Sequence, residues 1–294
     1  MRNFQKPGRS INMSANGMVA TSHPLAAKIG VDILQQGGNA IDAALAMAFM
    51  LPLCEPHSTG LFGDAFALIN KCGSNEILGF NGSGKAPLKA NSGKLRSEGC
   101  QVIQQNDVAA ITLPGAPELF DKLIQNYGNL GFETVCEPAI CYANEGVVVS
   151  PRVALDWEES SGHLKGNAKN FYLNKGKPLK AGEIFRAPNQ AKVLSNFAKN
   201  GMKGFYQGEV AEDIIGSLKQ LGGIHTHEDM ISVSSDQVKP LVCNFKNFDL
   251  VELPPNGQGI VAFLMRKILS NFNLNELDPM GSKRAHLEAE AAKL

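Results

Sequence analysis

Two short segments of this 294-residue chain hold residue types that could cleave an amide bond. Residues 225–229, His-Thr-His-Glu-Asp, set a hydroxyl between two imidazoles, and a hydroxyl is a useful nucleophile only when a neighbouring base takes its proton. The same segment is typical of a helix start, with Thr226 as the cap and two acidic residues in the first turn. We predict the helix start. Zinc would need further ligands at suitable spacing, which the sequence lacks, so we predict neither a metal nor a cofactor.

Residues 55–60, Glu-Pro-His-Ser-Thr-Gly, place a carboxylate, an imidazole and a hydroxyl close together in sequence. A nucleophile and its base must face each other in space, and neighbours on an extended turn generally do not. We therefore interpret this segment as part of the scaffold. The histidines His23, His163 and His286 are isolated, and we expect each to be satisfied locally or exposed.

Two glycine-containing segments are candidates for substrate binding. Residues 80–87, Phe-Asn-Gly-Ser-Gly-Lys-Ala-Pro, carry one cation, and residues 254–259, Pro-Pro-Asn-Gly-Gln-Gly, precede an apolar helix. Glycines allow a close approach of the backbone to a ligand or to another segment. A solvated lysine in a turn, and a plain loop before a helix, explain the same residues without a ligand. The residue types alone leave both interpretations open.

Three further blocks follow one another in a fixed order near the N-terminus. They are Ser-His-Pro-Leu-Ala at 22–26, Gly-Gly-Asn-Ala-Ile-Asp-Ala-Ala at 37–44, and Glu-Pro-His-Ser-Thr-Gly-Leu at 55–61. Together they resemble the opening of the γ-glutamyltranspeptidase family, whose members are N-terminal-nucleophile hydrolases made as self-cleaving proenzymes. The resemblance implies an α+β fold, the αββα four-layer sandwich, which residues 1–294 supply incompletely as a single partial domain.

The resemblance also implies where the nucleophile lies. In the family the catalytic threonine is followed closely by another Thr or Ser and by His, and it belongs to the downstream small subunit. Among Thr21, Thr59, Thr112, Thr134 and Thr226, only the last is followed by a histidine. The chain therefore resembles the large-subunit portion, truncated before the small subunit. We expect no catalytic residue in it, and the nucleophile beyond residue 294.

A substrate pocket is implied at residues 80–87. In glutamyl-specific members the segment ending in Ala-Pro carries an arginine that binds the α-carboxylate of the γ-glutamyl group, because the guanidinium matches a carboxylate in a bidentate manner. Here Ser83 takes that position, and Lys85 is the one cation in the segment. With Asn81 they are our candidate substrate-binding residues. Residues 254–259 also resemble the acylase-like and amidase-like members rather than the transpeptidases.

Composition limits the partners. Lys plus Arg and Asp plus Glu both number 28, so the net charge is zero, and no basic stripe predicts a nucleic acid or a membrane surface. The six scattered cysteines, without a C-x-x-C pair, favour reduced thiols and a cytoplasmic location, and no secretory signal is visible. We expect as partners a small-molecule amide substrate, the missing small-subunit segment and, as an option left open, another copy of the chain.

Hydrophobic periodicity predicts a mixture of helices and strands. The expected helices are 24–36, 40–51 ending at Pro52, one through Leu119 and Ile124, 132–144, 152–160, 191–200, 210–221, 260–269 and 283–294. The expected strands are 65–69 and 77–80 as a hairpin, 109–113, and the pair 238–245 and 248–253.

Two functions of different classes agree with this sequence. In the first, the chain is the large-subunit portion of an amide hydrolase or acyltransferase, of the γ-glutamyltransferase type known from glutathione metabolism, that acts through an acyl-threonine intermediate. In the second, it is a non-catalytic remnant or a binding module for a small molecule or a protein. A downstream segment that reaches a Thr-Thr-His-like motif would favour the first.

Overall fold

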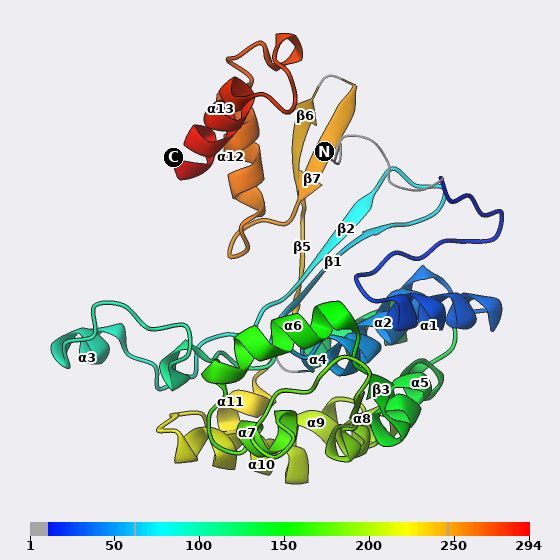
Figure 1. Cartoon of the computed structure of the whole chain (residues 1–294), viewed down its shortest axis with the longest axis vertical. Coiled ribbons are helices and arrows are strands. Elements are labelled where there is room, and N and C mark those ends of the chain that lie inside the picture. The colour runs from blue at the N-terminus through cyan, green and yellow to red at the C-terminus, as the bar shows by residue number, and fades with distance from the viewer. Residues whose placement is uncertain (1–10, 62, 246) are drawn as a thin grey trace. The chain divides into compact units, whose positions relative to one another are not determined.

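The computed structural model describes residues 11–61, 63–245 and 247–294. Their contacts divide the chain into two compact units (Figure 1). The larger unit contains residues 16–65 and 82–235, and the smaller unit contains residues 11–15, 66–81 and 236–294. The chain therefore passes four times between the units, after residues 15, 65, 81 and 235.

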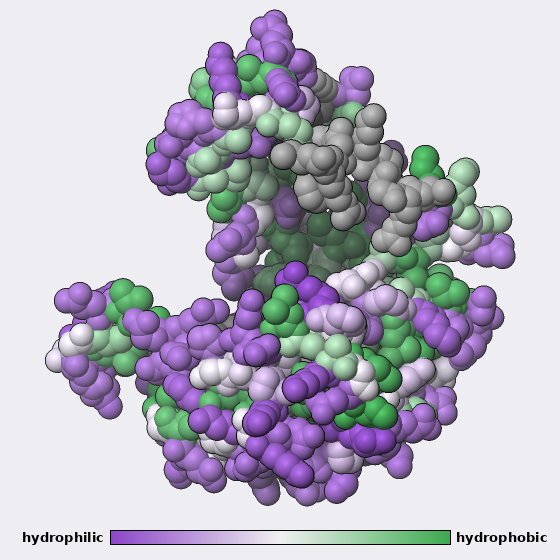
Figure 2. Space-filling view, viewed as in Figure 1, coloured by the Kyte–Doolittle hydropathy of each residue, from purple (hydrophilic) through white to green (hydrophobic). Residues whose placement is uncertain are grey.

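The larger unit is mainly helical. Its helices are α1 (Pro24–Gln35), α2 (Ala40–Cys54), α3 (Ser92–Ser97), α4 (Ala116–Tyr127), α5 (Phe132–Glu145), α6 (Pro151–Ser160), α7 (Ala168–Tyr172), α8 (Pro188–Asn200), α9 (Met202–Tyr206), α10 (Gly208–Gln220) and α11 (His227–Ile231). A short antiparallel pair, β3 (Val147–Val148) and β4 (Ile184–Phe185), joins them. On the face that Figure 2 shows, these helices present mostly hydrophilic residues to solvent.

Helix α2 forms the centre of this unit. Phe49 is fully buried, and its ring meets that of Phe120 at 5.4 Å between centroids and that of Phe132 at 5.5 Å. The one charged residue of the helix, Asp42, is also fully buried. Its carboxylate accepts backbone N–H groups of Asn39 (2.8 Å) and Asn129 (2.9 Å), so its charge is compensated by hydrogen bonds. The predicted burial of this helix on most sides is confirmed.

The smaller unit holds most of the β structure. Strands β1 (Ala65–Asn70), β2 (Ile77–Gly82) and β5 (Asp236–Val238) form a sheet in that order, with β2 and β5 antiparallel. Strands β6 (Leu241–Phe245) and β7 (Phe248–Glu252) make an antiparallel hairpin. Helices α12 (Gly259–Leu269) and α13 (Ser282–Lys293) pack together, and α12 contacts β7 (Figure 1). The two units together have the predicted α+β content.

Most expected elements are present, and three differ. Helix α2 continues through Pro52, because near a helix end a proline removes a single hydrogen bond and the buried side chains of Leu53 and Cys54 outweigh it. The predicted strand 238–245 is interrupted at Pro240, which cannot donate to a ladder, so it splits into β5 and β6. The predicted strand at 109–113 is wrong. The Asp107 carboxylate accepts the Ala109 N–H at 2.8 Å and starts a 3-10 turn instead.

Candidate functional site

Asn81, the first candidate, lies in β2 of the smaller unit. Its side-chain amide donates to Oδ1 of Asn256 at 2.8 Å. Asn256 belongs to the Pro-Pro-Asn-Gly-Gln-Gly turn that precedes α12. The structure thus joins two segments that the sequence singled out separately, and the bond holds the Asn81 side chain in one orientation.

Ser83 and Lys85 follow β2 and belong to the larger unit. Ser83 is half-buried and Lys85 is exposed. None of the ion pairs among the described residues involves Lys85, so its charge remains available to an anion. We call residues 83–88 the pocket loop, because it carries these two candidates and connects them to the rest of the unit.

The start of the pocket loop is held by main-chain contacts. Leu113 donates its N–H to the carbonyl oxygen of Lys85 at 2.9 Å. At Gly84 the two backbones are so close that a Cβ atom would lie 1.5 Å from the Leu113 oxygen. Glycine is therefore required at residue 84 for the loop to lie against residue 113.

Gly84→Ala is expected to destabilise the protein by roughly 1–3 kcal/mol, because the added methyl must push two backbones apart. The matched control is Gly216→Ala in α10, where a Cβ would meet nothing within 4 Å. The control is expected to gain up to about 1 kcal/mol from helix propensity. Urea unfolding of both variants measures the difference, and equal stabilities would contradict the close contact.

The far end of the pocket loop is held by α11. The carboxylate of Asp229 is fully buried and accepts the Leu88 N–H at 2.7 Å. It also accepts the N–H of Thr226 at 2.8 Å and the Thr226 hydroxyl at 2.7 Å, and the two residues form a capping box. The predicted helix start with Thr226 as cap is confirmed. The Thr226 hydroxyl donates to a carboxylate and caps a helix, which is a structural arrangement.

These contacts set the protonation of Asp229. Burial by itself raises the pKa of the carboxyl, but the hydrogen bonds from Leu88 and Thr226 favour the charged form, and the net pKa lies below the ordinary value. The stability that Asp229 contributes is therefore present above its ordinary pKa and is lost as the pH falls through the lowered value. The pocket loop keeps this anchor throughout the neutral range.

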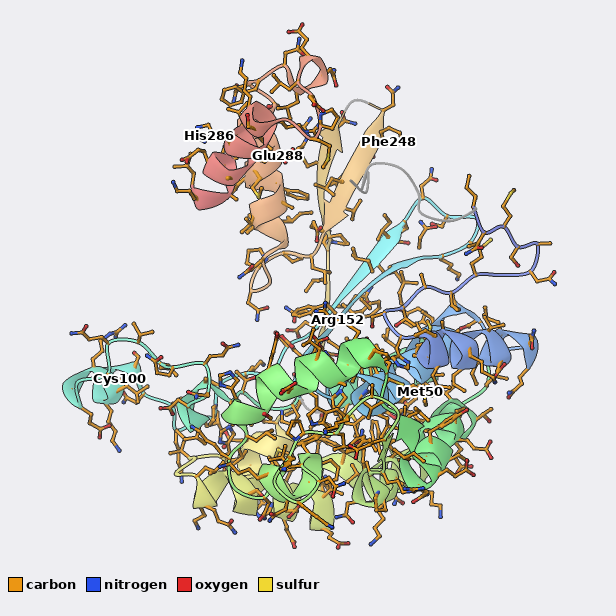
Figure 3. All side chains as sticks on the ribbon, viewed as in Figure 1. Met50, Cys100, Arg152, Phe248, His286 and Glu288 are labelled. Carbon is orange, nitrogen blue, oxygen red and sulfur yellow. The ribbon has the colours of Figure 1, made fainter. Side chains whose placement is uncertain are left out.

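The other catalytic-looking segment does not assemble a triad. The Ser22 hydroxyl donates to the Glu55 carboxylate, whereas His57 Nε2 lies 3.3 Å from a carboxylate oxygen of Asp156. Arg152, labelled in Figure 3, donates to the same Asp156 at 2.8 Å and holds the pKa of that carboxyl below its usual range. Glu55 and His57 thus take different partners, as expected of scaffold residues.

The isolated histidines follow the expectation as well. His23 is buried and its Nδ1 accepts the Leu25 N–H at 3.2 Å, which caps α1. His163 is exposed, and so is His286 on α13, which Figure 3 labels. Each is satisfied locally or exposed, as predicted.

In the described parts of the chain, no three His, Cys, Asp or Glu side chains are grouped to hold a metal ion. No helix built from the described residues has the length and apolar content that a bilayer crossing requires.

A hollow of about 780 Å³ in the larger unit is lined by α7, α8 and α10, and neither Ser83 nor Lys85 lines it.

Two contacts of this site were not predicted from the sequence. The Asn81–Asn256 bond joins residues 175 apart, and the Leu88–Asp229 bond joins residues 141 apart. One pattern in the sequence concerns the Leu88–Asp229 bond, since Thr-x-x-Asp is the spacing of a capping box. That pattern predicts the helix start at Thr226 but not the hydrogen bond that Asp229 also accepts from Leu88.

The chain is similar to known proteins over most of its length. A family model described as gamma-glutamyltranspeptidase matches residues 26–294. The chain is 30% identical over 278 residues to the glutathione hydrolase-like YwrD proenzyme of Bacillus subtilis (strain 168), covering 94% of this chain and 53% of that proenzyme. The chain spans about half the length of the curated relatives it matches.

Solved structures give the same result. The crystal structure of Helicobacter pylori gamma-glutamyltranspeptidase superposes with a TM-score of 0.89 at 30% identity, covering 97% of this chain and 83% of that one. Cephalosporin acylase from Bacillus halodurans gives 0.85 at 33% identity, covering 98% and 56%. A family match over residues 26–294, together with these structures, shows that the chain belongs to the γ-glutamyltranspeptidase family.

Proposed function

We propose that residues 1–294 are the large-subunit portion of an amide hydrolase or acyltransferase that acts through an acyl-threonine intermediate. The observation that carries this proposal is a family match over residues 26–294, in a chain that spans about half the length of relatives named as proenzymes. In this proposal the chain is one part of a single αββα domain, and the remaining segment supplies central strands and the threonine.

The environment of Thr226 supports a nucleophile outside this chain. An N-terminal nucleophile needs a hydroxyl free to attack and an α-amine free to take its proton. The Thr226 N–H and hydroxyl both donate to the buried Asp229 carboxylate. Thr21, Thr59, Thr112 and Thr134 have no histidine after them.

The contribution of this chain to the reaction is substrate binding. The threonine hydroxyl attacks the amide carbonyl, the amine leaves, and water or a second amine releases the acyl group. In the proposal Asn81, Ser83 and Lys85 contact the acyl portion and hold the carbonyl in place. A lysine at the pocket supplies a point charge, whereas bidentate binding of a carboxylate needs the fork of an arginine.

The six free cysteines support a reducing compartment, because extracellular proteins of this size tend to oxidise theirs to disulfides. Burial raises the pKa of the Cys54 thiol to about 12, so this thiol stays protonated and unreactive. We propose the cytoplasm as the location.

The complete protein is expected to discriminate weakly in favour of γ-glutamyl substrates. A charge-assisted hydrogen bond is worth about 1.5–3 kcal/mol, so the missing bidentate pair lowers the preference by roughly one to two orders of magnitude in kcat/KM. The measurement compares a γ-glutamyl anilide with the analogue that lacks the α-carboxylate. A strong preference for the carboxylate would show that an arginine elsewhere binds it.

The proposal is tested by extending the reading frame. The extended protein is expected to contain a Thr-Thr-His-like motif, to cut itself before that threonine and to hydrolyse simple acyl anilides. Mass spectrometry identifies the cut, and substitution of the new N-terminal threonine should abolish hydrolysis. A frame without such a motif would instead favour the binding module.

A further inference from the structure

The α11 segment, residues 225–231, has no part in the proposed chemistry, yet it touches the pocket loop and its support. Asp229 accepts the Leu88 N–H at 2.7 Å. His225, which is 7% exposed, places Nε2 2.9 Å from the carbonyl oxygen of Ile111. Two residues further on, Leu113 donates to Lys85. The segment thus contacts the loop directly through Asp229, and through His225 it contacts residues 111–113, which support the loop.

The Asp229 bond is specific to the pocket loop. A turn closes over residues 87–90, with the Ala90 N–H donating to the Pro87 carbonyl at 2.8 Å, and Leu88 is its second residue. Pro87 is buried while the Leu88 side chain is 66% exposed, so the Leu88 backbone rather than its side chain fixes this end of the loop.

We propose that Asp229 is a positioning residue for the acyl-binding pocket: by holding the Leu88 N–H it fixes the pocket loop, and so the place where Ser83 and Lys85 meet the acyl group. This inference rests on the proposed function. Asp229 does not contact the substrate in this account. It acts through the four-residue stretch from Lys85 to Leu88, both of whose ends are fixed by hydrogen bonds.

The chemistry of the contact requires a carboxylate. One oxygen accepts from Leu88, and the other accepts two donors from Thr226. An asparagine has one acceptor oxygen. In either orientation of its amide, the NH₂ group would face a hydrogen-bond donor, from Leu88 or from Thr226. Asp229→Asn therefore breaks the bond to Leu88 or the cap, while the volume of the buried side chain hardly changes.

The test uses Asp229→Asn and Leu88→Pro in the complete, self-processed enzyme. The second variant removes the same bond from the other side and leaves the buried carboxylate intact. Proline suits the second position of a turn, and the exposed leucine side chain is not needed for packing. If Asp229→Asn fails to fold, Leu88→Pro still decides the question.

The matched control is Asp42→Asn. Asp42 is another fully buried carboxylate in a capping box, and it also accepts a distant backbone N–H, that of Asn129 at 2.9 Å. Asp42→Asn should lower the stability of the protein about as much as Asp229→Asn does, but it leaves the contacts of the pocket loop unchanged. A general structural effect would appear in all three variants, and a positioning effect only in the first two.

We expect KM for a simple acyl anilide to rise about tenfold in Asp229→Asn and Leu88→Pro, as for the loss of one hydrogen bond to a charged group, with kcat little changed. Hydrogen exchange of the Leu88 amide should become faster in Asp229→Asn and stay slow in Asp42→Asn, whose KM should equal that of the wild type.

Faster exchange with an unchanged KM would overturn the positioning role, and so would an equal rise of KM in Asp42→Asn. An inactive wild-type enzyme would refute the proposed function and the inference resting on it. An active wild type with unchanged KM in both loop variants refutes the inference alone.

Discussion

Purified residues 1–294 are expected to release no amine from γ-glutamyl or simple acyl anilides and to remain one species of 31.5 kDa on long incubation. In the proposed function both results have the same cause, because hydrolysis and self-cleavage need the same threonine, which the proposal places outside residues 1–294. Loss of the nucleophile of a covalent hydrolase lowers kcat about a millionfold, so the remaining rate should equal the buffer blank. A chromogenic anilide assay and intact-mass spectrometry measure the two.

The control for this result is a set of single substitutions at the five threonines, each to alanine. None is expected to change the blank rate. Thr226→Ala should instead lower stability by about 1 kcal/mol, since it removes a helix cap. Turnover that a single threonine substitution abolishes, or two fragments that add up to 31.5 kDa, would contradict the prediction.

The isolated chain is also expected to self-associate through β1. Among the described residues, β1 is an outer strand of the β1-β2-β5 sheet, and its exposed side chains include Phe66 (43% exposed) and Leu68 (42%). An outer strand with an apolar face is a template for pairing with another chain. In the proposed complete protein, strands of the missing segment would cover such surfaces.

Leu68→Lys is expected to shift the isolated chain toward monomer, because a charged residue on an outer strand opposes pairing. Val31→Lys, at a valine 40% exposed on α1, is the matched control and should leave the association unchanged. Sedimentation at several concentrations measures both. A sharp monomeric peak of the unmodified chain, with cooperative unfolding, would contradict the prediction and strengthen the binding-module function.

Local pattern predicted the helices well, because periodicity reports which side of a helix is buried. Leu119 and Leu123 lie four residues apart, and both are buried on α4. The same reasoning failed at 109–113, where the hydrogen bond of Asp107 decided the backbone path. A side chain that competes with the backbone for hydrogen bonds leaves no trace in a hydrophobic pattern.

In the candidate site, too, local features could be predicted from the sequence and contacts between distant segments could not. Ser83 and Lys85 could be named from the sequence, because the Ala-Pro that follows them sets an alignment. Gly84 could be noted as a glycine, but not the reason for it, since Leu113 lies in another segment. Likewise Asp229 satisfies a local capping pattern, and its bond to Leu88 depends on how two distant segments fold together. Such contacts become visible only in three dimensions.

In the proposed function, the Gly84–Leu113 contact affects how substrate selectivity can evolve. The path of residues 83–85 is set by a glycine and by main-chain hydrogen bonds, whereas Lys85 is exposed. Exchanges at exposed positions usually change stability by about 0.5 kcal/mol or less. Exposed side chains on this loop can therefore be substituted during evolution without a change in the path of its backbone. In the proposed function this loop contacts the acyl group, so one scaffold of this kind can pass from one acyl group to another in single steps, each of them a folded protein.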